Sequence, residues 1–317
     1  MKSVVVAGSF NVDHVWRCDA LPAPGATIAG RYSTGPGGKG FNQAVAARRA
    51  GADITFVCAL GDDAGGELAR QLAAADGIVL AAEASTEPTG TAGIYVDSRG
   101  RNSIVIGPGA NASLSTEFMA AKAALIGDAG VLLAQLESPV ESIEAALGIA
   151  REAGVLTVLN PAPANAPSSI SLLKLADVLT PNETEFAALL GRHVGERVEA
   201  DDVAALDGAS LHALCRKLSG NTVVVTLGAV GVFVSHDEER LRGDSQPYYR
   251  VAAESVQVVD TTGAGDAFNG ALVASLAQAP DAAFIKHVRF ANQYAARSTE
   301  NEGAAVAMPR MTPADAG

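Results

Sequence analysis

The chain has 317 residues and a formal net charge of −12, and 48% of its residues are hydrophobic while only 5% are aromatic. The acidic balance argues against a nucleic-acid partner, which would need clustered Lys and Arg. No run approaches the roughly 20 consecutive apolar residues that cross a bilayer, so no membrane partner is expected either.

Short apolar runs alternate with helical stretches along almost the whole chain. We predict buried strands at 3–8, 53–59, 130–135, 155–159, 176–180 and 222–227. We predict helices at 41–50, 64–76, 138–153, 183–190, 208–219, 264–279 and 283–299, with Gly191 ending the fourth of these. This alternation indicates right-handed βαβ crossovers and an α/β fold with a mostly parallel sheet.

Two segments interrupt the alternation. Residues 12–34 and 91–106 alternate apolar and polar types without a helix between Val12 and Thr34. They are expected to form a small accessory sheet, or lid, that projects from the main layer. Because no linker or repeat divides the chain, a single domain over 1–317 is preferred to two domains.

The cysteines and histidines indicate neither disulfides nor a metal cage. Cys18, Cys58 and Cys215 are odd in number and show no CxxC spacing, and the five histidines show no metal-ligand spacing. Residues 1–10 are expected to form a strand rather than a signal segment. The pattern is typical of a cytoplasmic protein.

Polar residues follow six of the apolar runs, counting the run 256–259 as a strand. They are Asn11 with Asp13, then Glu137, Asn160, Asn182 with Glu185, Gly228 and Asp260. Ligands of open α/β sheets bind beyond the carboxyl ends of the strands. A single polar loop residue has about even odds of a purely structural role, but agreement between six strands predicts a ligand site at this edge.

The strongest local motif is the segment Asp260–Asp266, which precedes an apolar helical run. Gly263 and Gly265 leave backbone N–H groups uncovered at a helix start, where they can form an anion hole for a phosphoryl group. Asp266 lies in the first turn and can accept the proton of an attacking hydroxyl. Capping of the helix is the alternative role for Asp266, but capping does not require the two glycines.

A second glycine-rich motif covers residues 35–43 and contains a formal GxGxxG pattern. A dinucleotide fingerprint should directly follow the first strand, which this motif does not, and Lys39 lacks the following Ser or Thr of a Walker A loop. The motif instead allows the backbone to approach a polyhydroxylated ligand, with Lys39 and Asn42 as donors.

Two weaker motifs carry alternatives. Asn182 and Glu185 are three residues apart at a helix start, where they can organise the water shell of Mg²⁺ or simply cap the helix. The segment Thr226–Gly231 joins two apolar runs and can line a nucleotide or form a plain hairpin turn.

Taken together, these segments resemble the ribokinase-like carbohydrate kinases, the phosphofructokinase-B type. The resemblance runs in order over nearly the whole chain through Gly8–His14, Gly37–Ala44, Gln135–Pro139, Asn160–Ala164, Pro181–Glu185 and Asp260–Asp266. The glycine loop and the last segment mark the family, and the NVD, LESP and NPAPA sequences favour its members that act on ribose. The implied fold is a three-layer α/β/α domain with a small β-sheet lid.

The resemblance implies ATP-dependent phosphorylation of the primary hydroxyl of ribose, with Asp266 as general base and an anion hole at Gly263, Ala264 and Gly265. The implied sugar contacts are Asn11, Asp13, Gly38, Lys39, Asn42 and Glu137. The implied nucleotide contacts are Asn182, Thr226, Gly228, Gly231, Gly265 and Asn292.

The resemblance also implies two cations and a partner. Glu185 would hold Mg²⁺ through water, and K⁺ would be held by Asp260, Thr262, Ser298, Asn301, Gly303 and Ala307. The lid would close over the sugar and pair two subunits as a homodimer, with Trp16 in the lid or its contact.

Several positions depart from forms found in the family's members that act on ribose or in other relatives, and they leave alternatives open. They are Ala26, Ala229 with Val230, Thr262 with Gly263, and Asn292. Other acceptors therefore remain open: a nucleoside, fructose, or a keto-deoxy sugar acid paired with Arg17, Arg31 or Arg101. The alternatives outside kinase chemistry are a nucleotide-dependent oxidoreductase and a non-catalytic sugar-binding regulator.

Overall fold

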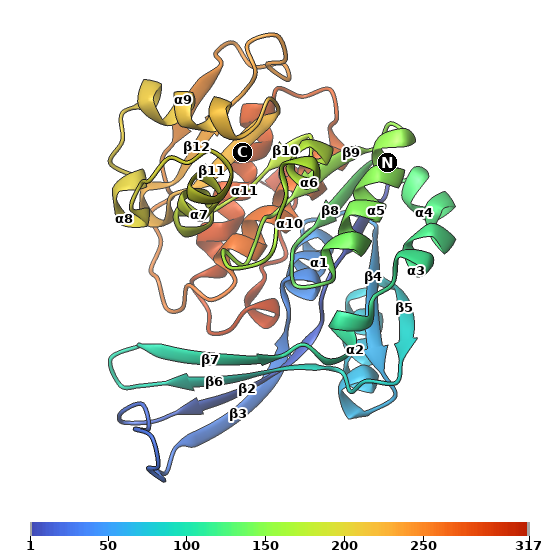
Figure 1. Cartoon of the computed structure of the whole chain (residues 1–317), viewed down its shortest axis with the longest axis vertical. Helices are drawn as coiled ribbons and strands as arrows, with labels where there is room; N and C mark the ends of the chain where they lie inside the picture. The colour runs from blue at the N-terminus through green and yellow to red at the C-terminus, as the bar shows by residue number, and fades with distance from the viewer. Residues whose placement is uncertain (1, 316–317) are drawn as a thin grey trace.

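A nine-stranded sheet forms the middle layer of the protein, and a separate four-stranded sheet projects from one side of it (Figure 1). The computed structural model describes residues 2–315. The large sheet has the order β13-β12-β11-β10-β9-β8-β1-β4-β5, and all its neighbours are parallel except β11–β12 and β12–β13. Its strands are β1 Val4–Ala7, β4 Ile54–Gly61, β5 Val79–Ser85, β8 Val131–Ala134, β9 Leu156–Leu159, β10 Val178–Leu179, β11 Thr222–Thr226, β12 Val232–Ser235 and β13 Tyr248–Val251.

Helices cover both faces of this sheet, because side chains that alternate along each strand are buried on both sides. Val4 and Val6 join one core cluster, whereas Val5 and Ala7 join the other. The first face carries α1 Lys39–Arg49, α2 Ala64–Asp76, α10 Ala264–Gln278 and α11 Phe284–Ser298. The second face carries α3 Thr116–Ala121, α4 Ala123–Gly127, α5 Val140–Glu152, α6 Ile170–Leu175, α7 Glu183–His193, α8 Ala200–Val203 and α9 Gly208–Leu218. The predicted three-layer α/β/α fold is confirmed.

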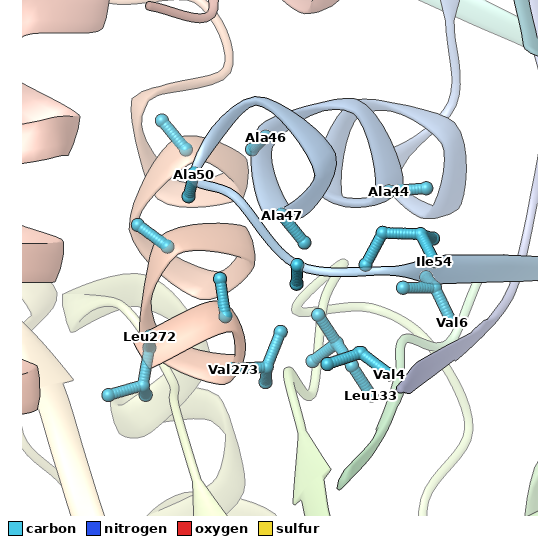
Figure 2. Close-up of a cluster of buried hydrophobic side chains, with 14 of the residues drawn as sticks. Val4, Val6, Ala44, Ala46, Ala47, Ala50, Ile54, Leu133, Leu272 and Val273 are labelled. Atoms are coloured by element: carbon cyan, nitrogen blue, oxygen red, sulfur yellow. The ribbon is translucent and has the colours of Figure 1, made fainter. Parts of the chain in front are cut away.

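Helices α1 and α10 approach each other unusually closely on the first face. A Cβ atom added at Gly270 would lie 2.4 Å from Ala46 Cβ and 2.6 Å from Gln43 O, so only glycine allows this contact. Figure 2 shows alanines of α1 in one cluster with Leu272 and Val273 of α10 and with the strand residues Val4, Val6, Ile54 and Leu133. The small side chains bring the two helix backbones together, and the site described below lies at one end of this contact.

The small sheet is the predicted lid. It has the order β3-β2-β6-β7, with β2 Asn11–Arg17, β3 Arg31–Gly37, β6 Gly90–Val96 and β7 Asn102–Gly107 (Figure 1). Trp16 is half-buried in it, with its ring centroid 5.2 Å from those of Tyr32 and Tyr95. The aromatic residue therefore belongs to the lid and not to the main core.

Four sequence-based expectations were wrong in detail. Gly35–Gly37 are the end of strand β3 rather than a loop, and α1 begins at Lys39, not at residue 41. Helix α7 continues past Gly191 to His193. Residues 256–259 form no strand: Val258 and Val259 are more than half exposed, and the segment runs outside the sheet. Strands β5, β12 and β13 were not predicted.

These errors have physical causes. The sequence of β5 is rich in alanine with one glutamate, and β13 is half-exposed, so neither edge strand shows the apolar run of a central strand. Gly191 does not adopt the left-handed conformation that a helix-ending glycine requires.

None of the helices within residues 2–315 is long and apolar enough to cross a membrane.

The close contact of α1 with α10 can be tested by replacing Gly270 with valine. We expect a loss of about 1–3 kcal/mol or more in the free energy of unfolding, because the added side chain overlaps Ala46 and the α1 backbone. Urea denaturation measures this change. Gly148→Ala is the matched control, because a Cβ atom in the middle of α5 meets no atom within 4 Å. It should stabilise the protein by about 0.5–1 kcal/mol. Equal effects of the two substitutions would contradict the packing argument.

Candidate active site

The carboxyl ends of the parallel strands and the first turn of α10 surround one polar site. The segments that follow β1, β8, β9 and β10 and the last residue of β11 all reach this edge. They supply Ser9, Glu137, Asn160, Asn182 and Thr226. Asp266 lies in the first turn of α10, is buried and faces these groups. The polar residues predicted to gather at this edge therefore do so, although the run 256–259 that precedes Asp260 is not a strand.

Two amides of α1 hold the carboxylate of Asp266. Asn42 Nδ2 donates to Oδ2 and Gln43 Nε2 donates to Oδ1, each at 2.9 Å. Two further hydrogen bonds fix the Gln43 side chain: its Nε2 donates to Asn160 Oδ1 at 3.1 Å, and its Oε1 accepts from Gln135 Nε2. Each Asp266 oxygen thus has a fixed donor, which sets the orientation of the carboxylate.

Charges of both signs meet around Asp266. Burial raises the pKa of Asp266, and the opposing effects of Lys39 and of the two amide hydrogen bonds do not cancel the increase. Burial alone would lower the pKa of Lys39, but the charges of Asp266, Glu137 and Glu185 outweigh it and raise this pKa above its ordinary value. Lys39 is therefore held as an ammonium ion among three carboxyl groups.

The turn before α10 presents uncovered backbone amides. Gly263 adopts φ 75°, which favours glycine, and a Cβ atom at Gly265 would meet no atom within 4 Å. Ala264 N donates to Thr261 O at 3.2 Å, whereas the N–H groups of Gly263, Gly265 and Asp266 donate no hydrogen bond within residues 2–315. The N-terminus of this 15-residue helix is suited to an anion.

A polar cavity of about 160 Å³ lies over this turn. Lys39, Asp266, Glu185 and Asn182 line it together with Thr226 and residues 263–265. Ammonium, amide and hydroxyl donors converge on one space of the size of a phosphate group or two. The arrangement can hold and neutralise a transferring phosphoryl group.

A second, larger cavity of about 500 Å³ continues from the first. Asn182, Thr226 and Gly265 line both cavities. All six residues predicted to contact the nucleotide line the larger one: Asn182, Thr226, Gly228, Gly231, Gly265 and Asn292. The segment Thr226–Gly231 is both a hairpin turn between β11 and β12 and part of this wall, so the two alternatives for it coexist.

The walls of the larger cavity include apolar side chains that the sequence analysis did not identify. They are Val232, Val256, Val258 and Phe268. Asn292 Nδ2 donates to Ala252 O at 2.7 Å, which fixes this amide at the wall. A phosphate-sized polar space joined to a roomy apolar space matches the two ends of a nucleotide.

On the lid side, Glu137 connects three segments. Its Oε2 accepts from the Ser9 hydroxyl at 2.6 Å and from the Lys39 backbone N–H at 2.9 Å. Gly38, with φ 87°, lies against the backbone of Asn11, because a Cβ atom there would be 2.8 Å from Asn11 N. The lid base, the start of α1 and the loop after β8 therefore meet at one point.

Asp13 extends the acidic cluster into the lid. Burial raises the pKa of Asp13 to about 7, and the nearby charges of Glu137 and Asp266 add to the increase. Asp13 also lies directly under Gly37, where a Cβ atom would overlap its carboxyl group. The structure thus brings Asn11, Asp13, Gly38, Lys39, Asn42 and Glu137, the residues predicted to bind the sugar, to one region between lid and core.

Asn182 and Glu185 form a complete capping box at the start of α7. Glu185 N donates to Asn182 Oδ1 at 2.8 Å, and Asn182 N donates to Glu185 Oε2 at 2.9 Å. Both residues also line the polar cavity. Burial raises the pKa of Glu185, although the Asn182 N–H and Lys39 oppose it. The pair therefore caps the helix and faces the site at once.

The donor set at this cavity fits a magnesium ion that keeps most of its water. Within residues 2–315 no three His, Cys, Asp or Glu side chains are grouped to hold a metal directly. Glu185 lines the cavity beside the uncovered amides. Mg²⁺ usually binds through one or two carboxylates, several waters and substrate phosphates, so Glu185 could hold it next to a nucleotide.

The two segments predicted to hold potassium lie side by side. Asp260 Oδ2 accepts from Gly303 N at 3.0 Å, and Val259 N and Asp260 N both donate to Thr299 O. Thr262 donates to Asp260 Oδ1 through its N–H and its hydroxyl. These hydrogen bonds lower the pKa of Asp260 although its partial burial opposes them, so the carboxylate is anionic and fits a cation beside it.

The structure adds residues that sequence reasoning did not assign. Gln43, Ser9 and Asn111 hold proposed site residues by hydrogen bonds, and Asn160 accepts a hydrogen bond from Gln43. Gln43 and Ser9 were within motifs already noted, and Asn160 follows a predicted strand. No sequence signal singled out Asn111.

Comparisons with known proteins agree with this geometry. A family model described as pfkB family carbohydrate kinase matches residues 1–311. Ribokinase of Haemophilus influenzae is 40% identical over 311 residues, which cover 97% of this chain and 95% of that protein. Ribokinase of Mus musculus is 37% identical over 314 residues, covering 97% of this chain and 92% of that protein.

Solved structures agree as well. Ribokinase from Giardia lamblia superimposes with a TM-score of 0.86 at 29% identity, covering 98% of this chain and 96% of that one. Arabidopsis thaliana ribokinase complexed with ribose and ATP gives a TM-score of 0.81 at 29% identity, covering 99% of this chain and 97% of that one. The match of the family model, the relatives and the shared architecture agree: the chain belongs to the pfkB family of carbohydrate kinases.

Proposed function

We propose that the protein is a kinase that transfers the γ-phosphate of ATP to the primary hydroxyl of ribose. The observation that carries the proposal is the position of Asp266, a carboxylate fixed by Asn42 and Gln43 beside the uncovered amides of the α10 turn. The relatives at 40% and 37% identity are named ribokinase. The Arabidopsis neighbour was solved with ribose and ATP, which supports these two substrates.

In the proposed reaction Asp266 is the general base. The hydroxyl oxygen of the sugar bonds to the γ-phosphorus, its proton passes to the Asp266 carboxylate, and the bond from phosphorus to the β–γ bridging oxygen breaks to release ADP. The free N–H groups at Gly263 and Gly265, with Ala264 in the same turn, stabilise the charge of the phosphoryl group in transit. Catalysis is then mainly positioning and electrostatics, as in other phosphoryl transfers.

The sugar is proposed to lie between the lid and the core. Asp13 and Glu137 accept hydrogen bonds from its hydroxyls, while Asn11, Lys39 and Asn42 donate. Gly38 allows close approach of the backbone. An ionised Asp13 that accepts two adjacent hydroxyls would favour a vicinal diol, because an analogue that lacks one hydroxyl leaves a buried charge poorly paired.

The nucleotide is proposed to occupy the two joined cavities, with its phosphates near Asn182 and Thr226 and its base near Asn292. Bound magnesium would neutralise phosphate charge beside Glu185. Potassium is proposed to be held by Asp260, Thr262, Ser298, Asn301, Gly303 and Ala307. An ion there would order the turn at Gly263 from outside the reaction, since Gly303 binds Asp260 directly.

The alternatives have less support. The GxGxxG match at 35–40 ends a lid strand and starts α1, so it is not the strand-to-helix turn of a dinucleotide site. A non-catalytic regulator would not need a buried carboxylate beside free amides. A nucleoside, fructose or a keto-deoxy sugar acid remains an acceptor to be tested against ribose.

The decisive experiment is acceptor-dependent ADP release from Mg-ATP. Ribose, deoxyribose, fructose, adenosine and keto-deoxy-gluconate would each be tested with and without potassium. Ribose should give the highest kcat/KM, and potassium should increase it. In Asp266→Asn, kcat should fall about 10²- to 10⁴-fold, because the variant keeps the shape but loses the base.

Asp128→Asn, which removes an exposed carboxylate after α4, is the control and should behave as wild type. Turnover of another acceptor in place of ribose would support ATP-dependent phosphoryl transfer but would refute ribose as the substrate. No turnover with any acceptor in folded protein would refute the kinase proposal. An unchanged kcat in Asp266→Asn would refute its role as base.

The pKa of Asp13 predicts a pH dependence of sugar binding. Because this pKa is about 7, the carboxyl group becomes protonated and loses acceptor capacity as the pH falls through neutrality. KM for ribose should therefore rise toward about tenfold per pH unit below pH 6, while KM for ATP changes little. Asp13→Asn should have a high KM for ribose at every pH. A KM for ribose that is constant between pH 5.5 and 8 in wild type would contradict this role.

We further propose a homodimer formed through the lid. The lid strands expose apolar side chains on both faces: Tyr32 and Val105 on one face and Ile104 and Ile106 on the other are each about half exposed or more. Exposed apolar side chains gathered on one small sheet are typical of an interface. Sedimentation should show a dimer at micromolar concentration in wild type and a shift toward monomer in Val105→Asp. Surface substitution Asp128→Asn is the control. A monomeric wild type would refute the proposal.

A further inference from the structure

The roots of the lid converge on the side chain of one buried residue, Asn111. Asn111 lies in the short 3₁₀ helix η1, Gly109–Ser113, just after the last lid strand β7, and is 2% exposed. It contacts Phe10 and Asn11 at the start of β2, and Gly90 at the start of β6 packs against it. Three chain segments that enter or leave the lid thus meet at this amide.

The contacts of Asn111 use both ends of its amide. Its Oδ1 accepts from Phe10 N at 3.0 Å, and its Nδ2 donates to Phe10 O at 2.9 Å, so the side chain pairs with the backbone like a neighbouring strand. The same Nδ2 also donates to Asn11 Oδ1 at 2.9 Å. Because the Phe10 contacts require Oδ1 and Nδ2 in these places, Asn111 cannot present an acceptor to Asn11.

This contact determines which end of the Asn11 amide is available. Asn11 Oδ1 is occupied, whereas Asn11 Nδ2 donates no hydrogen bond within residues 2–315 and is not among the fully enclosed polar atoms that lack a partner. An Asn side chain can otherwise turn over and exchange its donor and acceptor ends. Here the donor end stays open, on the same face of strand β2 as Asp13.

The backbone at Gly90 packs tightly against this pair. A Cβ atom at Gly90 would lie 2.2 Å from Asn111 Nδ2 and 2.4 Å from Asn11 Oδ1. The backbone of β6 therefore closes over the hydrogen bond and keeps both amides in place.

We infer that Asn111 is a positioning residue for sugar recognition: it holds the Asn11 amide with its NH₂ group toward the sugar. Asn111 acts through Asn11 and does not touch the substrate. The inference rests on the proposed function, because it takes Asn11 as a sugar contact. A sugar hydroxyl would then meet a donor from Asn11 and acceptors from Asp13 and Glu137, which gives that side of the site a defined pattern of donors and acceptors.

The test uses Asn111→Asp, which has nearly the same shape. The new carboxylate still accepts from Phe10 N but has no hydrogen to donate, so the Asn11 amide should turn over and offer its NH₂ group to it. The carbonyl oxygen of Asn11 would then face the sugar in place of its NH₂ group. We expect KM for ribose to rise about tenfold or more, the effect of one mispaired buried hydrogen bond, with KM for ATP unchanged and kcat within a few-fold.

A matched control and a second variant accompany it. Asn102→Asp makes the same charge change at an exposed position of lid strand β7 and should leave all constants unchanged. Asn111→Ser is too short to reach Asn11 and adds no charge, so it should also raise KM for ribose. If Asn111→Asp does not fold, Asn111→Ser still tests the inference.

A double-substitution cycle separates positioning from general structural damage. If Asn111 acts through Asn11, then Asn111→Asp should add little to the KM for ribose of Asn11→Ala. Additive effects, or a wild-type KM for ribose in both folded Asn111 variants, would overturn the inference. Wild-type protein that does not use ribose would instead refute the proposed function and this inference with it, so the two failures are distinguishable.

Discussion

The close contact between α1 and α10 is the constraint on which the site depends. Gly270 and the alanines of α1 let the two helices approach until Gln43 O and Ala46 Cβ lie where a side chain of residue 270 would be. At one end of this contact Asn42 and Gln43 reach Asp266. Because small residues at this contact let the two helices pack backbone to backbone, the carboxylate is positioned by the core rather than by a mobile loop.

Around this rigid point the protein gathers groups that repel one another. Glu137, Glu185 and Asp266 lie around a single ammonium group, Lys39, and Asp13 lies near Glu137 and Asp266. Burial raises the pKa of Asp13, Glu185 and Asp266. Such a cluster is unfavourable in the empty site and becomes favourable when hydroxyls donate to it and a cation enters with the nucleotide. Binding of both substrates therefore relieves an electrostatic conflict that folding creates.

The sequence predicted the layers, the lid and the chain segments that meet at the site, because strand and helix periodicity and glycine-rich turns are local signals. It did not predict the contact of Gln43 with Asp266, whose positions are 223 apart, or that of Asn111 with Asn11, which are 100 apart. Spacing along the chain contains no information on such pairs. The edge strands β5 and β13 were missed for a different reason, since half-exposed strands lack a continuous apolar run.

Gly263 and Gly265 flank the same anion-binding turn but are constrained differently. At Gly263 the left-handed backbone and the contact with Ala304 already exclude a side chain on structural grounds. At Gly265 a methyl group would meet no neighbouring atom, so the folded structure can accommodate it. Any restriction on residue 265 must therefore come from the ligand that needs the bare amide. Variant screens that measure only abundance or thermal stability would classify alanine there as harmless, and only a measurement of turnover would reveal the loss.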